Sequence, residues 1–359
     1  MDRRIFLLSL LAACGCGQND VPRKEADASS VASKAVESPP ASGPELATEQ
    51  VRTKISRVSV LSFGDRPNTA DTLMAAAPGH FRARLTELGY IEGKTIVVEE
   101  KFANGDPQRL TQLARQIVES NPDVIVAFAA AATAAARRAT STIPIVMVHA
   151  GNPVGSGLVS SLAHPGGNVT GTTSMVPDLG AKQVELLREL LPGLAKLGLL
   201  VNPTNAGVSP MLANVTETAR RFNISVVVAE VTRVEDFDRA LALLHEARLD
   251  ALLVAIEPLI VLNRARVLEF AAASRLPVSY DVGSGIVRQG GLISYGPVLL
   301  PHYSLAADYV DKILKGAKPG DLPVHQPTQF ALTINLKTAK ELGLTIPQTL
   351  LQRADEVIQ

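Results

Sequence analysis

The stretch HAGNPVGSGLVSSLAHPGGNVTG, residues 149–171, follows an apolar run and sets glycines and prolines around one short apolar segment. Glycine adopts turn conformations that other residues avoid, and proline fixes its own backbone angle, so this composition predicts tight turns. We expect a sharp turn at 151–153, a short helix over 158–163 and a stop for that helix at 164–167. The stretch therefore predicts a strand that ends in a rigid connection.

Strand and helix patterns alternate on both sides of this stretch. The continuous apolar run at 58–63 is typical of a strand buried on both faces, and residues 106–120 begin with Asp-Pro and carry apolar residues at helical spacing. The same alternation restarts near residue 197. Such a chain predicts an α/β fold with two doubly wound parallel-sheet lobes. Because ligands bind beyond the carboxyl ends of the strands in open α/β sheets, two facing lobes predict a ligand cleft.

The N-terminus combines a basic start with a short apolar segment. Residues 5–13 are apolar but too few to cross a hydrocarbon core of about 30 Å, so they predict an export signal. Small residues lead to Cys14, as in the bacterial lipobox, so residues 1–14 predict a lipoprotein-type signal peptide with Cys14 as the lipidated residue. The alternatives are an ordinary signal peptide and, for the export route, a twin-arginine signal. Residues 15–54 are rich in Ser, Ala, Pro and charge, which predicts a disordered tether.

Composition and spacing argue against other kinds of function. Lys plus Arg and Asp plus Glu both number 35, Trp is absent and aromatic residues make up 4 %, so we expect no nucleic-acid partner. Both cysteines lie near the N-terminus and the histidines show no metal-ligand spacing, so we expect no metal and no cofactor. The sequence contains no nucleophile elbow, phosphate loop or dinucleotide signature, so we predict that the chain is not an enzyme.

The opening stretch also resembles a known signature. Residues 152–171 closely resemble a motif of the solute-binding components of ABC transporters, in the family that includes tryptophan- and tyrosine-binding proteins. Further segments agree in the expected order, among them LTELGYIEGKTIVVEEKFANGD (85–106), GGLISYGP (290–297) and RADEVI (353–358). The resemblance runs from about residue 58 to residue 358 and implies the type I periplasmic binding protein fold.

That fold implies three crossovers between the lobes. We expect residues 55–175 plus 283–318 in the first lobe and residues 176–282 plus 319–359 in the second. In this prediction GGLISYGP returns the chain to the first lobe, and the segment after residue 318 brings it back to the second.

The candidate ligand contacts lie just past the predicted strand ends. The helix that begins near Ala131 offers backbone N–H groups to a ligand carboxylate, and Thr133 could replace the hydroxyl that Ala130 lacks relative to the family pattern. Asn202 follows the strand at 197–201 and is a further candidate. The candidates for stacking on a planar ligand, for which lobe packing is the alternative role, are Phe63, Tyr280 and Tyr295.

The predicted acidic contacts depart from the family pattern. Asn152 stands where the family usually has Asp, and Glu257 stands where an Asp often precedes Pro. Because Asn152 is neutral, Glu257 and Asp281 are the expected partners of a ligand ammonium group. These departures from the family pattern leave the identity of the ligand open.

The leading hypothesis is a periplasmic monomer, anchored to the bacterial membrane through a lipid on Cys14. It would close on a small organic solute, such as an aromatic amino acid or a related compound, and deliver it to an ABC permease and its ATPase. The alternative is a sensing module that presents ligand occupancy to a membrane sensor.

Overall fold

The structure is a computed structural model that describes residues 54–66, 72–174, 179–281 and 284–359. The predicted signal peptide with Cys14, and all of the predicted tether except Lys54, lie outside these residues. No helix among the described residues is both long and apolar enough to cross a membrane.

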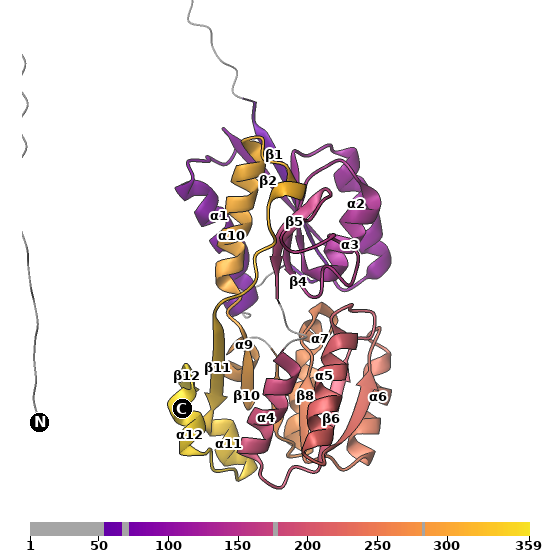
Figure 1. Cartoon of the computed structure of the whole chain (residues 1–359), viewed down its shortest axis with the longest axis vertical. Helices are drawn as coiled ribbons and strands as arrows, with labels where there is room; N and C mark the ends of the chain where they lie inside the picture. Colours follow the sequence, from indigo (N-terminus) through magenta and orange to yellow (C-terminus); the bar gives the residue numbers. More distant parts are fainter. Residues whose placement is uncertain (1–53, 67–71, 175–178, 282–283) are drawn as a thin grey trace, which may run out of the picture. The chain divides into compact units, whose positions relative to one another are not determined.

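The first sheet contains five parallel strands in the order β2-β1-β3-β4-β5 (Figure 1). The strands are β1 (Ser56–Ser62), β2 (Ile96–Phe102), β3 (Val124–Phe128), β4 (Ile145–Ala150) and β5 (Val169–Thr173). Apart from Val97 on the edge strand β2, their valines and isoleucines are buried, as the continuous apolar runs predict. Helices α1 (Thr72–Glu87) and α10 (Leu300–Leu314) cover one face, and α2 (Pro107–Glu119) and α3 (Ala129–Ala139) cover the other.

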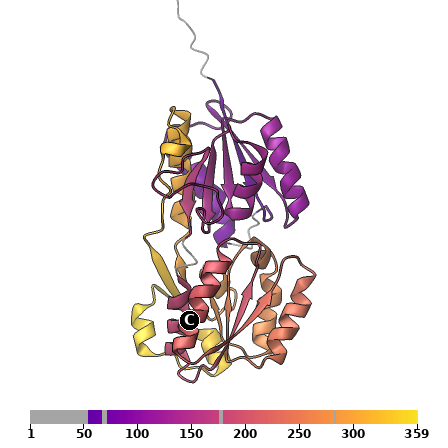
Figure 2. The same cartoon turned by 45° about the vertical axis from the view of Figure 1, so that its right-hand side comes forward.

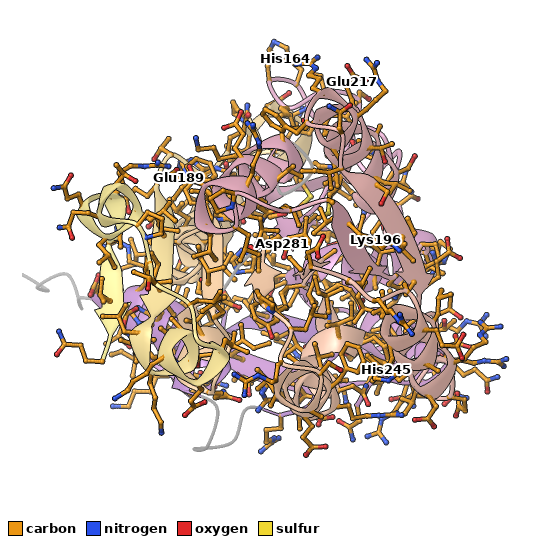
Figure 3. The ribbon with its side chains drawn as sticks, turned by 90° about the horizontal axis from the view of Figure 1, so that it is seen from below. His164, Glu189, Lys196, Glu217, His245 and Asp281 are labelled. Carbon is orange, nitrogen blue, oxygen red and sulfur yellow. The ribbon has the colours of Figure 1, made fainter. Side chains whose placement is uncertain are left out.

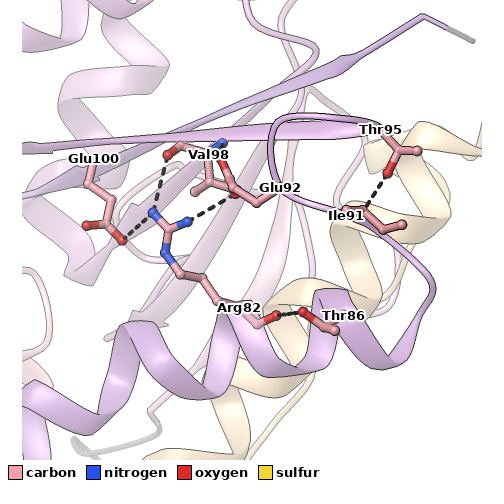
Figure 4. Close-up of polar contacts among 7 residues, drawn as sticks. All are labelled: Arg82, Thr86, Ile91, Glu92, Thr95, Val98 and Glu100. Carbon is pink, nitrogen blue, oxygen red and sulfur yellow. Dashed lines mark hydrogen bonds and ion pairs between the residues drawn. The ribbon is translucent and has the colours of Figure 1, made fainter.

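The edge strand β2 is joined to helix α1 by one arginine. Arg82 donates to the carboxylate of Glu92 at 3.1 Å, to the carbonyl oxygen of Val98 at 3.3 Å and to the carboxylate of Glu100 at 3.3 Å (Figure 4). Because the arginine is partly exposed, each ion pair adds little stability by itself. The three contacts together hold α1 against the edge of the sheet that faces away from β5.

The second sheet contains seven strands in the order β12-β11-β10-β9-β8-β6-β7. They are β6 (Lys196–Val201), β7 (Ser225–Glu230), β8 (Ala251–Val254), β9 (Val278–Tyr280), β10 (Ile293–Pro297), β11 (Phe330–Asn335) and β12 (Glu356–Ile358). Only the β10–β11 pair in this sheet is antiparallel. Its helices are α4 (Gly180–Leu190), α5 (Val208–Arg221), α6 (Asp236–Glu246), α7 (Pro258–Leu262), α8 (Arg264–Ala273), α9 (Ser284–Arg288), α11 (Leu336–Leu342) and α12 (Gln348–Arg353) (Figure 2). The prediction of an α/β fold with two parallel-sheet lobes is confirmed.

The chain returns to the first lobe later than predicted. The carbonyl oxygen of Val287 in α9 accepts from Asn335 of β11, and strand β10 pairs with β9 and β11, so the assignment of residues 284–297 to the first lobe is wrong. The next helix, α10, does pack on the first sheet. The segment after it, including the 3-10 helix η2 (Pro319–Asp321), then runs beside β5.

Backbone hydrogen bonds explain where the chain leaves the first lobe. The N–H of His325 donates to the carbonyl oxygen of Gly171 at 2.8 Å, and the N–H of Thr173 donates to the carbonyl oxygen of His325 at 2.9 Å. These bonds satisfy the edge of β5 and keep residues 319–325 with the first sheet. The predicted boundary at residue 318 is therefore too early.

The opening stretch forms turns where a helix was predicted. Residues 158–163 are not helical, because their backbone groups bond outside a helical pattern. The N–H of Ser160 donates to the carbonyl oxygen of Pro165, and the carbonyl oxygen of Leu162 accepts from the distant N–H of Val324. Leu158 is nevertheless buried in the core, so the apolar segment packs the loop in place. Proline and glycine determined the turns as predicted, but tertiary contacts replaced the helix.

Candidate ligand-binding site

A cavity of about 220 Å³ lies where the carboxyl ends of strands from both sheets meet. The first sheet lines it from the ends of β1, β3 and β4, and the second sheet lines it from the segments after β6, β8 and β9. Representative residues from these six positions are Ser62, Phe128, His149, Asn205, Ala255 and Asp281. The location is the one expected for a ligand site in facing open α/β sheets.

Two strained residues form the first-lobe wall of the cavity. Ala129 and His149 both have a left-handed backbone, with φ of 66° and 59°, and both line the cavity. Such a conformation costs about 1–2 kcal/mol for a residue with a Cβ, and this kind of strain concentrates at functional sites. At Ala129 the chain turns directly into α3, whose first turn has no side-chain cap. The backbone N–H groups at the start of α3 are thus uncapped beside the cavity.

Asp281 is the most deeply buried acid of the cavity. It follows β9. Figure 3 shows it in the interior of the molecule, whereas His164 and Glu217 lie at the outer edge of the molecule in this view. One carboxylate oxygen accepts from the N–H of Ile256 at 2.7 Å, and the other is buried with no hydrogen-bond partner among the described residues. Burial, together with the negative charge of Glu257, raises the pKa of Asp281 to about 8.

Glu257 lies beside Asp281 and has a structural task as well. Its Oε1 accepts from the N–H of Ile260 at 2.9 Å, which caps α7, and its Oε2 accepts from Asn202 at 3.3 Å. Burial raises the pKa of Glu257 in spite of these hydrogen bonds, which act in the opposite direction. Asn202 is in turn held by Thr204, which donates to its Oδ1.

His149 adds an uncharged polar group to the wall. Its ring meets Tyr303 edge-on with centroids 4.8 Å apart and lies 5.0 Å from the ring of His302. Burial and the neighbouring His302 hold the pKa of His149 well below its usual value, so the imidazole is neutral at physiological pH. Neither ring nitrogen has a hydrogen-bond partner within the described part of the chain.

Among the predicted contacts, Ala130, Glu257 and Asp281 line the cavity. Ala131 is exposed on α3 and does not line it. Thr133 is buried one turn into α3, where its hydroxyl donates to the carbonyl oxygen of Ala129 at 2.8 Å. Asn202 acts through Glu257, as described above. The strand-end rule thus led to the edge of each sheet that lines this cavity, but not to the direction of each side chain.

The three predicted stacking residues lie elsewhere. Phe63 belongs to the core of the first lobe, and Tyr295 stacks on Phe330 with ring centroids 6.3 Å apart. Tyr280 is fully buried on the opposite side of the second sheet from Asp281, because successive residues of a strand point to opposite faces. Packing, the alternative role, is the one observed for these side chains.

Asn152 connects the two lobes and does not line the cavity. Its side-chain amide donates to the carbonyl oxygen of Ala206 at 3.2 Å, in the loop between β6 and α5, and its Oδ1 accepts from the N–H of Gly155 at 3.0 Å. A Cβ on Gly155 would lie 2.3 Å from the Asn152 amide nitrogen, so the glycine makes room for this side chain. One glycine of the opening stretch therefore serves a contact between lobes.

The two aromatic lining residues were not among the predicted contacts. Phe128 and Tyr303 both line the cavity, with ring centroids 5.3 Å apart in an edge-to-face arrangement. Phe128 is the last residue of β3, so its position could have been found from the strand end. Tyr303 lies on α10, and no local signal places that helix beside β4. No group of three or more His, Cys, Asp or Glu among the described residues could hold a metal ion.

Comparisons with known proteins agree with this geometry. The family model described as ABC transporter substrate binding protein matches residues 69–358. A tyrosine-binding protein of Clostridioides difficile (strain R20291) is 29 % identical over 273 residues, which cover 76 % of this chain and 78 % of the relative.

Two solved structures are also similar to the chain. A conserved domain protein from Vibrio cholerae is 32 % identical with a TM-score of 0.77, covering 85 % of this chain and 100 % of that one. An ABC domain from Streptococcus pneumonia in complex with L-Trp is 27 % identical with a TM-score of 0.78, at the same coverage.

Proposed function

Because the chain belongs to the family of ABC transporter substrate-binding proteins, we propose that it is the receptor of an importer. It captures a small organic solute in the cavity between its lobes, closes on it, and delivers it to a permease and ATPase. The observation that carries this proposal is the cavity itself, which joins polar groups and aromatic rings at the carboxyl ends of both sheets.

The arrangement of charge supports an amino acid or a related compound as the ligand. Asp281 and Glu257 supply carboxyl oxygens on the second-lobe side, which suits an ammonium group. The uncapped start of α3 supplies backbone N–H groups on the first-lobe side, which suits a carboxylate. Phe128 and Tyr303 add aromatic surface, and the similar proteins include one named for tyrosine and one solved with L-Trp.

We further propose that the chain acts in the periplasm as a lipid-anchored monomer. The anchor would be a lipid on Cys14, with residues 15–54 as the tether. The described chain begins at the amino end of β1, while the cavity lies at the carboxyl end of that strand.

A thermal-shift screen of the full chain tests the binding function. Amino acids, nucleosides, short carboxylates and aromatic catabolites are compared, and an aromatic amino acid is expected to raise Tm. A ligand at a hundredfold excess over Kd stabilises the folded state by about 2.7 kcal/mol, which is large enough to measure.

A matched pair of variants shows whether the shift arises in the cavity. Ala130→Trp should abolish it by filling the cavity, whereas Val234→Trp, on an exposed surface outside the cavity, should preserve it. If no compound of any class raises Tm, the proposed function is wrong.

A further inference from the structure

Two carboxyl groups share one cavity without a cationic partner. Neither Asp281 nor Glu257 forms an ion pair within 4.0 Å with any described Lys, Arg or His. The buried Oδ2 of Asp281 has no hydrogen-bond donor among those residues. Burying a charge in this way is costly unless a partner is supplied, and the unfilled partner position belongs to a cavity.

The other charged and titratable residues around the cavity leave the two acids unpaired. Arg66, from the segment after β1, lies over the ring of Phe102 at 5.7 Å, and Asp65 beside it is exposed. Arg264, on α8, donates to Gln289 and to the carbonyl oxygen of Val261. The groups contributed by β4 and α10 are the neutral imidazole of His149 and the phenol of Tyr303.

Two buried carboxyls that line one cavity without a cation cannot both ionise at low cost, because burial penalises each charge and the charge of Glu257 opposes that of Asp281. Glu257 has hydrogen bonds from Ile260 and Asn202 that favour its ionised form, whereas Asp281 has an unpartnered oxygen. In the ligand-free protein the burial of both groups therefore places a proton on Asp281. Its raised pKa, about 8, agrees with this assignment.

We propose that the cavity takes an organic ammonium ion whose capture displaces the proton of Asp281 to solvent, so that binding and proton release are coupled. The inference rests on the proposed function. The ammonium keeps its charge, the O–H bond of the carboxyl breaks, the proton leaves to the buffer, and a charge-assisted hydrogen bond replaces it. As the pH rises toward 8, the affinity for such a ligand therefore increases about tenfold per pH unit, because one proton is released for each ligand bound.

Isothermal titration calorimetry of the full chain at pH 7 tests the coupling. L-tryptophan, tryptamine and indole-3-propionate are titrated in phosphate and in Tris, whose different ionisation enthalpies report the number of protons released. L-tryptophan and tryptamine should each release close to one proton, and indole-3-propionate none. Binding of either amine without proton release would overturn the inference and leave the proposed function intact.

Three variants identify the carboxyl group that releases the proton. Asp281→Asn keeps an oxygen for the N–H of Ile256 and should abolish proton release, while Glu257→Gln should reduce it. Asp311→Asn, which alters a buried acid on α10 outside the cavity, should leave proton release unchanged. Release that persists in Asp281→Asn would overturn the assignment.

A titration without ligand keeps the inference testable if none of the three probes binds. Between pH 6 and pH 10, ligand-free wild type should give up one more proton than Asp281→Asn, with a midpoint near 8. Identical curves would overturn the inference whatever the ligand is. Failure of the whole compound screen, by contrast, would count against the proposed function.

Discussion

At the scale of one residue, the burial of Asp281 in the cavity reduces the stability of the folded protein. Its carboxyl is buried, lacks a donor for one oxygen and lies near Glu257, whereas in the unfolded chain it would be solvated. The folded protein therefore binds more protons than the unfolded chain between pH 3.8 and about 8. Stability falls as the pH rises through that interval, because the raised pKa favours the folded state only while the carboxyl is protonated.

Asp281→Asn should therefore stabilise the ligand-free protein, and increasingly so at higher pH. The gain over wild type in the free energy of unfolding should grow by up to about 1.4 kcal/mol per pH unit, approaching a plateau near pH 8. Urea denaturation at pH 5, 7 and 9 measures it. A difference that is the same at all three pH values would contradict the assigned burial of this carboxyl.

The sequence predicted the acids of the site better than its aromatic residues. Asp281 follows β9 directly and Glu257 comes three residues after the end of β8, so the strand ends locate both. Tyr280 was misplaced because one step along a strand reverses the face, and a three-residue strand gives too short a pattern to fix that face. Tyr303 comes from a helix whose position depends on a crossover, which no local pattern encodes.

At the scale of elements, the pairing of β4 with β5 depends on one glycine. Gly171, the last residue of the opening stretch, lies opposite Met147 with φ of 128°. A Cβ there would lie 2.1 Å from the carbonyl oxygen of Met147, which is backbone and cannot move aside as a side chain could. Glycine is thus required here for the close approach of two strands.

Gly171→Ala should destabilise the protein by more than about 2 kcal/mol, because the strain falls on a buried strand pair. Gly167→Ala, in the same stretch, should be close to neutral because no atom lies within 4 Å of the added Cβ. Thermal unfolding of both variants measures the contrast. Equal stability of the two would show that the β4–β5 contact is looser than described.

The errors at this scale share a cause. The helix predicted over 158–163 and the first-lobe assignment of residues 284–297 both failed where long-range hydrogen bonds decided the outcome. By contrast, the helix behind Asp106 was predicted correctly, since its cap is local: the carboxylate accepts from the N–H groups of Gln108 and Arg109. Local signals were sufficient for most elements but not for assigning segments to lobes.

At the scale of the described chain, two contacts join the lobes on different loops. The Asn152 amide donates to the carbonyl oxygen of Ala206, and Gly105 lies so close to Leu262 that a Cβ would approach the leucine side chain to 2.9 Å. A carboxylate at position 152 could not donate this hydrogen bond. In the proposed closure of the lobes, the amide of Asn152 supplies a hydrogen bond between them, although that residue does not line the cavity.

Asn152→Ala should accelerate ligand dissociation about two- to tenfold, the effect of losing one hydrogen bond in the closed state. Ser161→Ala is the matched control, because among the described residues the Ser161 hydroxyl bonds only to the backbone of His164, within the same stretch. Stopped-flow displacement with the compound identified by the screen gives both rates. An unchanged rate in Asn152→Ala would show that the contact does not contribute to closure.

The late return of α10 to the first sheet has a consequence for biosynthesis. The valines on one face of that sheet, including Val58 and Val146, are covered by Tyr303, Val310 and other residues of α10. A nascent chain that has reached only residue 280 has every strand of the first sheet but lacks this cover. The first lobe therefore cannot complete its core until residue 314 has left the ribosome. Until then the uncovered apolar face of the sheet is exposed and can bind a chaperone.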